Sequence, residues 1–188
     1  MKTFNELCAL HGTDKGTTVR ECHGYSFVYD EVFSHLRNEK IKMLEIGIAD
    51  PLFPGASLRV LTDYFPNGTI YGFDIQHVDF KIDRTVIFQG DSSVREDVQK
   101  IIDHDETPFD IILDDGSHEH KHHMIHFDVL FPHLKSGGIY IIEDLHALDG
   151  RQTIDYFWNE ENKAELKSKG ITKAELSCHG KLLVLHKA

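Results

Sequence analysis

Apolar runs and amphipathic stretches alternate along most of the chain. Short apolar runs typical of strands cover 41–48, 69–74, 86–90, 109–113 and 139–143, and helical patterns separate them. A strand that is buried on both faces reads as a continuous apolar run, as in a parallel sheet. The alternation predicts an α/β fold with a Rossmann-like, doubly wound and mostly parallel sheet.

Helices are predicted at the start of the chain. Thr3 and Glu6 have the spacing of a capping box, so a short helix should run to about His11 and end at Gly12. A second helix should run from about Tyr25 to Leu36. Its expected buried stripe consists of Phe27, Val28, Val32, Phe33 and Leu36.

The last part of the chain predicts a polar helix and a hairpin. The helix should run from about Gln152 to Lys169, and the hairpin should join 174–178 and 181–186 through His179-Gly180 at the edge of the sheet. Because no linker or repeat interrupts the pattern, we expect one domain over 1–188, with a helical cover over 1–38 and a cofactor-binding core over 39–188.

Two of the apolar runs end in pairs of carboxylates. One leads into Asp114-Asp115-Gly-Ser-His118, and a later one leads into Glu143-Asp144. Ligands of open α/β sheets collect beyond the carboxyl ends of the strands. Carboxylate oxygens from separate strands suit Mg²⁺ or another divalent cation. These residues therefore predict a shared functional site.

The earlier strand ends suit a cationic cofactor that carries adenosine. Glu45 stands before a single glycine, Gly47, and Ser57 lies in the start of the next helix. The next strand ends at Asp74, which can accept hydrogen bonds from both ribose hydroxyls, and Asp91 follows the third strand on the expected adenine side. The glycine-rich fingerprint of dinucleotide enzymes is absent. This pattern favours S-adenosylmethionine, which carries a sulfonium and no phosphate.

Composition narrows the class of partner. The formal net charge of −11 argues against nucleic acid, because binding to phosphates needs Lys and Arg. Cys8, Cys22 and Cys178 are far apart, which is typical of reduced thiols. Neither a secretory signal nor an apolar stretch of membrane-helix length is visible. We expect a cytoplasmic protein that binds a small molecule and no membrane, with homo-oligomerisation left open.

Several motifs together resemble a known family. They are Gly12-Thr-Asp-Lys15, His23-Gly-Tyr25, Leu44-Glu-Ile-Gly47, Ser57-Leu58, Tyr64-Phe-Pro-Asn67, Gly72-Phe-Asp-Ile75, Gly90-Asp91, Asp114-Asp-Gly-Ser-His118, His122, Leu130-Phe-Pro132 and Ile142-Glu-Asp-Leu145. In these motifs the chain resembles class I S-adenosylmethionine-dependent methyltransferases. Among these it is most similar to the metal-dependent macrolide sugar O-methyltransferase family typified by mycinamicin 2''-O-methyltransferase.

The resemblance implies a Mg²⁺-assisted O-methyltransferase acting on a small hydroxylated acceptor, such as a sugar. It implies Asp115, Glu143 and Asp144 as metal ligands and His118 as the general base. The residues expected at the cofactor are Glu45, Gly47, Ser57, Asp74, Asp91 and Asp114. One departure is the loop 49–55, which is shorter than the glycine-rich loop of the family and carries two prolines. This loop is expected to hold the methionine end of the cofactor differently.

Two other functions fit parts of the sequence. Five histidines lie between His118 and His126, and their i, i+4 spacings occur in zinc helices, so one alternative is a zinc-dependent hydrolase. The helical pattern, however, places His120 and His123 on the buried stripe and His122 off it, which favours packing or solvated roles. The other alternative is a cofactor-binding module without catalysis.

Overall fold

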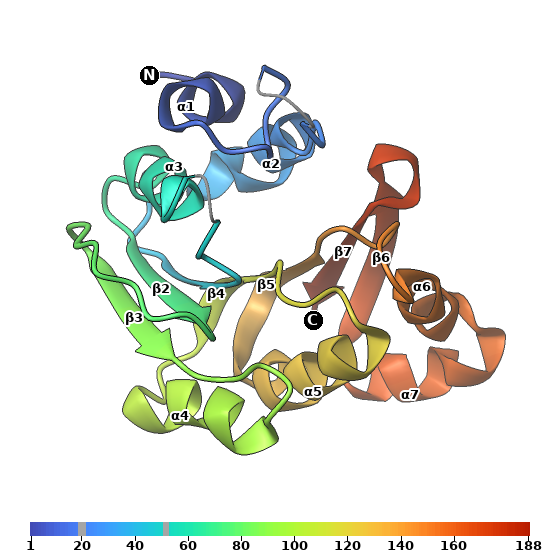
Figure 1. The fold of residues 1–188 in the computed structure, drawn as a ribbon. Coiled ribbons are helices and arrows are strands. Elements are labelled where there is room, and N and C mark those ends of the chain that lie inside the picture. Colours follow the sequence, from blue (N-terminus) through green and yellow to red (C-terminus); the bar gives the residue numbers. More distant parts are fainter. Residues whose placement is uncertain (19–21, 51–52) are drawn as a thin grey trace. The chain divides into compact units, whose positions relative to one another are not determined.

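The structure, a computed structural model, describes residues 1–18, 22–50 and 53–188. The chain divides into two compact units, Met1–Gln89 and Gly90–Ala188 (Figure 1). Every strand pair within the first unit is parallel, and in the second unit only the C-terminal hairpin introduces antiparallel pairs. The predicted fold class, a Rossmann-like and mostly parallel sheet with a C-terminal antiparallel hairpin, is confirmed.

The first unit combines three parallel strands with helices. Its elements are α1 (Phe4–His11), α2 (Ser26–Phe33), η1 (Ser34–Leu36), β1 (Lys42–Ile46), α3 (Ala56–Tyr64), β2 (Thr69–Asp74) and β3 (Thr85–Gln89). The strands lie in the order β3-β2-β1, and β1 pairs with β2 so that Glu45 lies opposite Gly72. Helix α1 contacts α2 and α3. The carboxyl ends of β1 and β2 carry Glu45, Gly47 and Asp74, three of the residues predicted at the cofactor.

Helix α1 begins and ends as predicted. The Thr3 hydroxyl accepts the Glu6 N–H at 3.2 Å, and the Glu6 carboxylate accepts the Thr3 N–H at 2.8 Å. Gly12 ends the helix with a φ of 83°, a left-handed conformation that glycine adopts without a steric penalty. The capping box is thus confirmed as the local cause of this helix.

The predicted buried stripe of the second helix was right for Phe33 and wrong for Phe27. Phe27 is 67% exposed, whereas Tyr25, Tyr29 and Phe33 are fully buried. The ring of Tyr29 stacks on Phe33 at 5.1 Å between centroids and meets Phe4 edge-on at 5.0 Å. Both periods fit helical spacing, and the larger apolar area of the aromatic face decides which one faces the core.

The second unit contains the remaining strands and a row of helices. Its elements are α4 (Arg95–His104), β4 (Phe109–Asp114), α5 (His120–Leu130), η2 (Phe131–His133), β5 (Leu134–Ile142), α6 (Gly150–Trp158), η3 (Glu160–Asn162), α7 (Lys163–Ser168), β6 (Ile171–Ser177), η4 (Cys178–Gly180) and β7 (Leu182–Lys187). The strands lie in the order β4-β5-β7-β6, with β4 and β5 parallel. Each helix from α4 to α7 contacts the next one (Figure 1).

Two predictions for the end of the chain had different outcomes. The hairpin is confirmed, since β6 and β7 pair antiparallel and β6 is the edge strand. The prediction of a single helix over 152–169 was wrong, because α6 ends before Asn159 and a separate short helix, η3, follows. The side chain of Asn159 accepts the Glu161 N–H at 3.0 Å, which is the capping role that asparagine favours over a helix interior.

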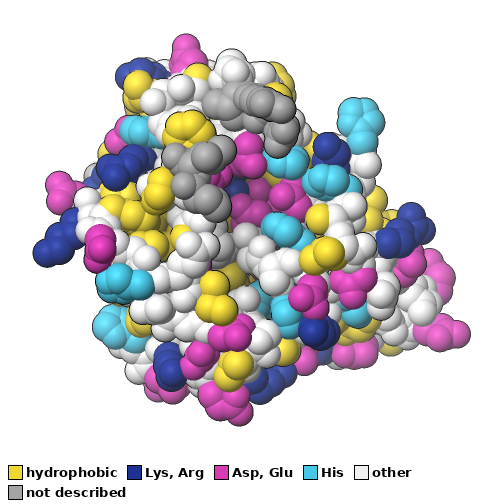
Figure 2. Space-filling view, viewed as in Figure 1, with side chains coloured by type: hydrophobic (Ala, Val, Ile, Leu, Met, Phe, Trp, Pro, Cys, Tyr) yellow, Lys and Arg dark blue, Asp and Glu magenta, His cyan; other side chains and the backbone are white. Residues whose placement is uncertain are grey.

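The surface agrees with the acidic composition. Figure 2 shows Asp, Glu and His side chains over much of the visible face, and the Lys and Arg side chains on that face lie apart from one another. Among the residues described, no helix is both long enough and apolar enough to cross a membrane.

Candidate active site

In the first unit, Glu45 and Ser57 meet beside the turn after β1. Glu45 is completely buried, and its Oε2 accepts the Ser57 hydroxyl at 2.8 Å. The Nζ of Lys15 lies 3.7 Å from Oε1 of the same carboxylate, and Lys15 is only 3% exposed. Burial of a carboxylate without such partners would be costly. Lys15 was not predicted as a site residue, although it ends the Gly12-Thr-Asp-Lys15 motif.

Gly47 and Asp74 are brought together at the same strand ends. Gly47 has a φ of 85°, and its N–H donates to the carbonyl of Phe73 at 2.9 Å. One oxygen of Asp74 accepts the N–H groups of Ile48 at 2.8 Å and Ala49 at 2.9 Å. Its other oxygen accepts the N–H of Gln76 at 2.8 Å. Since a carboxylate can accept about four hydrogen bonds, Asp74 retains capacity for one more.

The loop after β1 is described only in part. Pro51 and Leu52 lie outside the described residues, so the departure predicted for this loop falls partly on residues whose structure is not described. At its end, Gly55 has a φ of 70°, and a side chain there would collide with the ring of Phe80. Glycine is therefore required where the loop enters α3.

In the second unit, Asp91 shapes the turn after β3. Hydrogen bonds from Ser93 hold the pKa of Asp91 below its usual range, and its Oδ1 accepts the Ser93 N–H at 2.8 Å. The N–H of Asp91 donates to Asp97 at 2.9 Å, which ties the turn to the start of α4. The predicted adenine-side residue thus lies in a turn that its own side chain stabilises.

Three side chains converge at the ends of β4 and β5. Ligand atoms of Asp115, His118 and Asp144 all lie within 4.8 Å of one another. The Nε2 of His118 is 3.9 Å from Oδ2 of Asp144. His118 and Asp144 have φ values of 59° and 55°, in the left-handed region that side chains with a Cβ disfavour. Such backbone strain is concentrated at functional sites, which supports this cluster as one.

The cluster contains two of the three predicted metal ligands, Asp115 and Asp144, together with the predicted base. Glu143 is not part of the three-residue group among the described residues, and it is 2% exposed. Its backbone N–H donates to the carbonyl of Asp114 at 2.9 Å, so the two strand ends are joined beside the cluster. The structure therefore brings His118, predicted as the base, beside two of the predicted metal ligands.

Asp114 lies behind this cluster and is fully buried. Its Oδ2 accepts a hydrogen bond from Nδ1 of His126 at 2.8 Å and one from the Tyr140 hydroxyl at 3.4 Å. Burial alone would raise the pKa of Asp114, but the charge and hydrogen bond of His126 lower it to about 2. The same contact raises the pKa of His126 against the effect of burial. His126 belongs to the histidine-rich segment, but nothing in its spacing identified this contact.

The other histidines of α5 contact hydroxyl groups rather than Asp114. His120 and His123 contact the Thr153 hydroxyl at 3.0 and 2.9 Å, and Nδ1 of His122 contacts the Ser117 hydroxyl at 2.5 Å. The prediction that His122 lies off the buried stripe was wrong, since it is 7% exposed and held by Ser117. Among the described residues, none of the helix histidines belongs to a group of three potential metal ligands. The zinc-hydrolase alternative therefore receives no support.

The donor chemistry suits a hard divalent cation better than zinc. Asp115 and Asp144 offer carboxylate oxygens, which Mg²⁺ and similar ions prefer, from the ends of two strands. Asp74, beside the glycine turn, has capacity for one more hydrogen bond, which a ribose hydroxyl could donate. Both donor sets fit the groups that the sequence predicted.

Comparison with known proteins identifies related enzymes, although no family model matches the chain. The mycinamicin VI 2''-O-methyltransferase of Micromonospora griseorubida is 42% identical over 129 residues, which are 65% of this chain and 32% of that enzyme. The demethylmacrocin O-methyltransferase of Streptomyces fradiae is 34% identical over 184 residues, which are 91% of this chain and 43% of that enzyme.

A solved structure extends the similarity to the fold. The MycE methyltransferase from the mycinamycin biosynthetic pathway, in complex with Mg, SAH and mycinamycin VI, matches with a TM-score of 0.81 and 29% identity. The match covers 100% of this chain and 55% of that chain. The chain thus spans between about a third and about half of the length of these relatives. The chain is therefore homologous to the macrolide sugar O-methyltransferases typified by the mycinamicin enzyme, as its motifs predicted.

Proposed function

We propose that the protein is an S-adenosylmethionine-dependent, Mg²⁺-assisted O-methyltransferase that acts on a hydroxyl of a small acceptor, such as a sugar or a sugar-bearing metabolite. The observation that carries this proposal is the convergence of Asp115, His118 and Asp144 at two strand ends, with two of the three residues in strained backbone. The relatives described above are named as O-methyltransferases of mycinamicin VI and of demethylmacrocin, which supports the same reaction.

The proposed roles are assigned to residues of each unit by itself. In the first unit, Glu45, Gly47, Ser57 and Asp74 bind the cofactor, with Asp74 accepting from the ribose. In the second, Asp91 and Asp114 serve the cofactor, and Asp115, Glu143 and Asp144 are the metal ligands.

The chemistry requires removal of a proton from a weakly acidic hydroxyl. A bound divalent cation lowers the pKa of an oxygen that it contacts. His118 accepts the proton at Nε2, and the carboxylate of Asp144, 3.9 Å away, stabilises the imidazolium that forms. A diol acceptor is favoured, because two neighbouring hydroxyls orient the nucleophile.

The proposed partners follow from charge and composition. A small hydroxylated acceptor is favoured over nucleic acid or a membrane surface by the net charge of −11. A cytoplasmic location fits the three dispersed cysteines. Size-exclusion chromatography with light scattering would decide whether the protein forms a homo-oligomer.

Calorimetry of cofactor binding tests the proposal. S-adenosylmethionine should bind the wild-type protein, and Asp74→Ala should weaken that binding by about 1 to 3 kcal/mol, because ribose hydroxyls lose an acceptor. Asp79→Ala is the matched control, since the side chain of Asp79 is 94% exposed in the same unit. Unchanged affinity in folded Asp74→Ala would contradict the assignment.

A transfer assay tests the metal. Transfer of a labelled methyl group to a panel of sugars, glycosides and catechols should require Mg²⁺ and should stop in EDTA. Full methyl transfer after thorough chelation would refute metal assistance. The assignment of the cofactor-binding residues would still be tested separately by the calorimetry.

A further inference from the structure

His126 of α5 makes two hydrogen bonds to different parts of the second unit. Its Nδ1 lies 2.8 Å from Oδ2 of Asp114, at the end of β4. Its Nε2 lies 2.9 Å from the carbonyl oxygen of Ser92, in the turn after β3. The side chains of His126 and Asp114 are both completely buried, so water does not compete for these contacts.

The two partners fix the protonation of the ring. A carbonyl oxygen can only accept a hydrogen bond, and an ionised carboxylate can only accept as well. A neutral imidazole carries one N–H, so one of its nitrogens would direct a lone pair at an acceptor. Both contacts are satisfied together only when both ring nitrogens carry a proton. His126 is therefore a buried imidazolium that donates in two directions.

The two acceptors stand next to residues of the proposed site. Ser92 follows Asp91, which we assign to the adenine side, and Asp114 precedes Asp115, which we assign to the metal. The carbonyl of Asp114 also accepts the N–H of Glu143 at 2.9 Å. A single side chain thus connects the turn that should contact the cofactor with the strand end that should hold the cation.

We propose that His126 is a positioning residue that clamps the Ser92 turn to the end of β4 and thereby sets the positions of Asp91 and Asp115. The proposal rests on the proposed function for the ligands involved, but the clamp itself is a property of the ligand-free protein. No other natural side chain of this size donates hydrogen bonds from two opposite edges of a ring. Asparagine carries both of its N–H donors on one nitrogen, so it would place its own oxygen against the acceptor on the other side.

Nuclear magnetic resonance of the ligand-free protein tests the clamp directly. In protein labelled with ¹⁵N-histidine at neutral pH, both ring nitrogens of His126 should show the signature of protonated nitrogen, and both ring protons should exchange slowly. His126→Asn identifies the signals by their loss. A ring nitrogen of His126 that carries no proton would overturn the proposal.

Calorimetry tests the positioning role. His126→Asn should weaken binding of S-adenosylmethionine and of Mg²⁺ by about 10- to 100-fold each, the range typical of residues that orient ligating groups. The matched control is His123→Asn, which removes another fully buried histidine of α5, hydrogen-bonded to Thr153 instead. This control should leave both affinities within about threefold of wild type, by the additivity expected of separate contacts. Equal losses in the two variants would show that His126 is only part of the core and would overturn the positioning role.

A double variant separates action through Asp114 from general damage. If His126 acts through Asp114, the double variant Asp114→Asn/His126→Asn should lose little more affinity than the single variant that has the larger loss. Losses that add fully would contradict the proposal. If wild-type protein bound neither ligand, the proposed function would fail, and the magnetic resonance experiment would still decide whether the clamp exists.

Discussion

At the scale of single residues, the candidate site depends on side chains that lie in unfavourable backbone. His118 and Asp144 both have positive φ, and both contribute to the cluster with Asp115. The turn Asp115-Gly-Ser-His118 is short, so His118 can face the same cation site as Asp115 only if the backbone turns sharply. The strain at His118 is thus a local consequence of bringing two side chains that are three residues apart in the sequence to the same site.

Replacement of His118 should separate catalysis from binding. His118→Ala should lower turnover by about 10² to 10⁴, the range for a positioned acid or base, and should leave cofactor affinity near that of wild type. His122→Ala, which loses the contact with Ser117, should cost much less turnover. Steady-state kinetics with the true acceptor make the comparison. Equally mild effects would indicate that His118 is a wall of the pocket and that the cation alone activates the hydroxyl.

Two substitutions of Asp144 should reveal the strain. Asp144→Gly and Asp144→Ala both remove the carboxylate and should both weaken Mg²⁺ binding. Only glycine relieves the positive φ, so Asp144→Gly should be more stable than Asp144→Ala by about 1 kcal/mol. Urea unfolding in EDTA measures the difference. Alanine and glycine variants of equal stability would show that this backbone conformation costs little.

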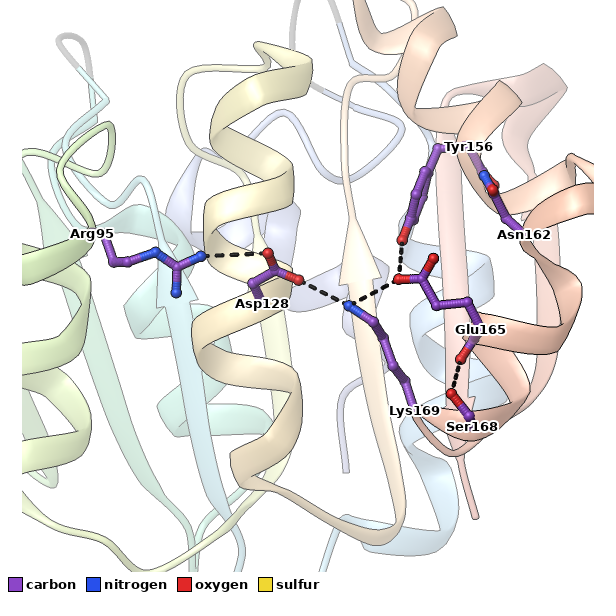
Figure 3. A network of polar contacts seen from close by, with 7 residues as sticks. All are labelled: Arg95, Asp128, Tyr156, Asn162, Glu165, Ser168 and Lys169. Carbon is purple, nitrogen blue, oxygen red and sulfur yellow. Dashed lines mark hydrogen bonds and ion pairs between the residues drawn. The ribbon is translucent and has the colours of Figure 1, made fainter.

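At the scale of elements, a polar network joins the helices of the second unit. Figure 3 shows Asp128 of α5 between Arg95 of α4, 3.4 Å away, and Lys169, 3.0 Å away. Lys169 also contacts Glu165 at 3.3 Å, and Glu165 accepts the Tyr156 hydroxyl at 3.2 Å. Burial and the nearby Glu165 raise the pKa of Tyr156, so this hydroxyl stays protonated and donates.

Asp128 is the residue that tests the network. Asp128→Asn should lower the free energy of unfolding by about 1 kcal/mol at low salt, because the carboxylate serves two cations on neighbouring helices. The loss should shrink in about 1 M salt, where exposed charges are screened. Asp155→Asn is the control, since Asp155 pairs only with the exposed Arg151 of its own helix among the described residues. An equal loss of unfolding free energy in both variants would mean that the network stabilises the protein no more than an isolated ion pair does.

At the scale of the whole molecule, the buried pair of Asp114 and His126 should control stability in acid. The pKa of Asp114 is lowered from 3.8 to about 2, so its contribution is present above pH 4 and is lost as the pH falls from about 4 to about 2. The contribution of His126, whose pKa is raised, is present at low pH and is lost as the pH rises through that raised pKa. The pair therefore stabilises the protein most between these two limits.

The acid side of this profile is directly measurable. In EDTA, the free energy of unfolding should fall by on the order of 2 kcal/mol between pH 4 and pH 2 from this pair alone. In Asp114→Asn this part of the decrease should be missing. Chemical unfolding monitored by circular dichroism at several pH values provides the test. An unchanged slope in Asp114→Asn would show that other carboxylates govern acid unfolding.

The sequence by itself determined what depends on neighbours along the chain. The capping box at Thr3, the strands that end at Asp74 and Asp114, and the C-terminal hairpin follow from local hydrogen bonds and from hydrophobic period, and the structure contains each of them. Because a strand delivers the residue after it to a known edge, the sequence also placed Asp74 beside the turn at Gly47. The motifs then predicted the homology with sugar O-methyltransferases.

Only the tertiary structure decided which side chains meet across longer separations. The contacts of Tyr29 rather than Phe27 with the core, of His118 with Asp115 and Asp144, and of His126 with Ser92 depend on how helices and strands pack. Several helix faces and several ligand sets satisfy the same spacing. The choice among them is made by buried area and by the need to pair every buried charge, and these quantities exist only in the folded chain.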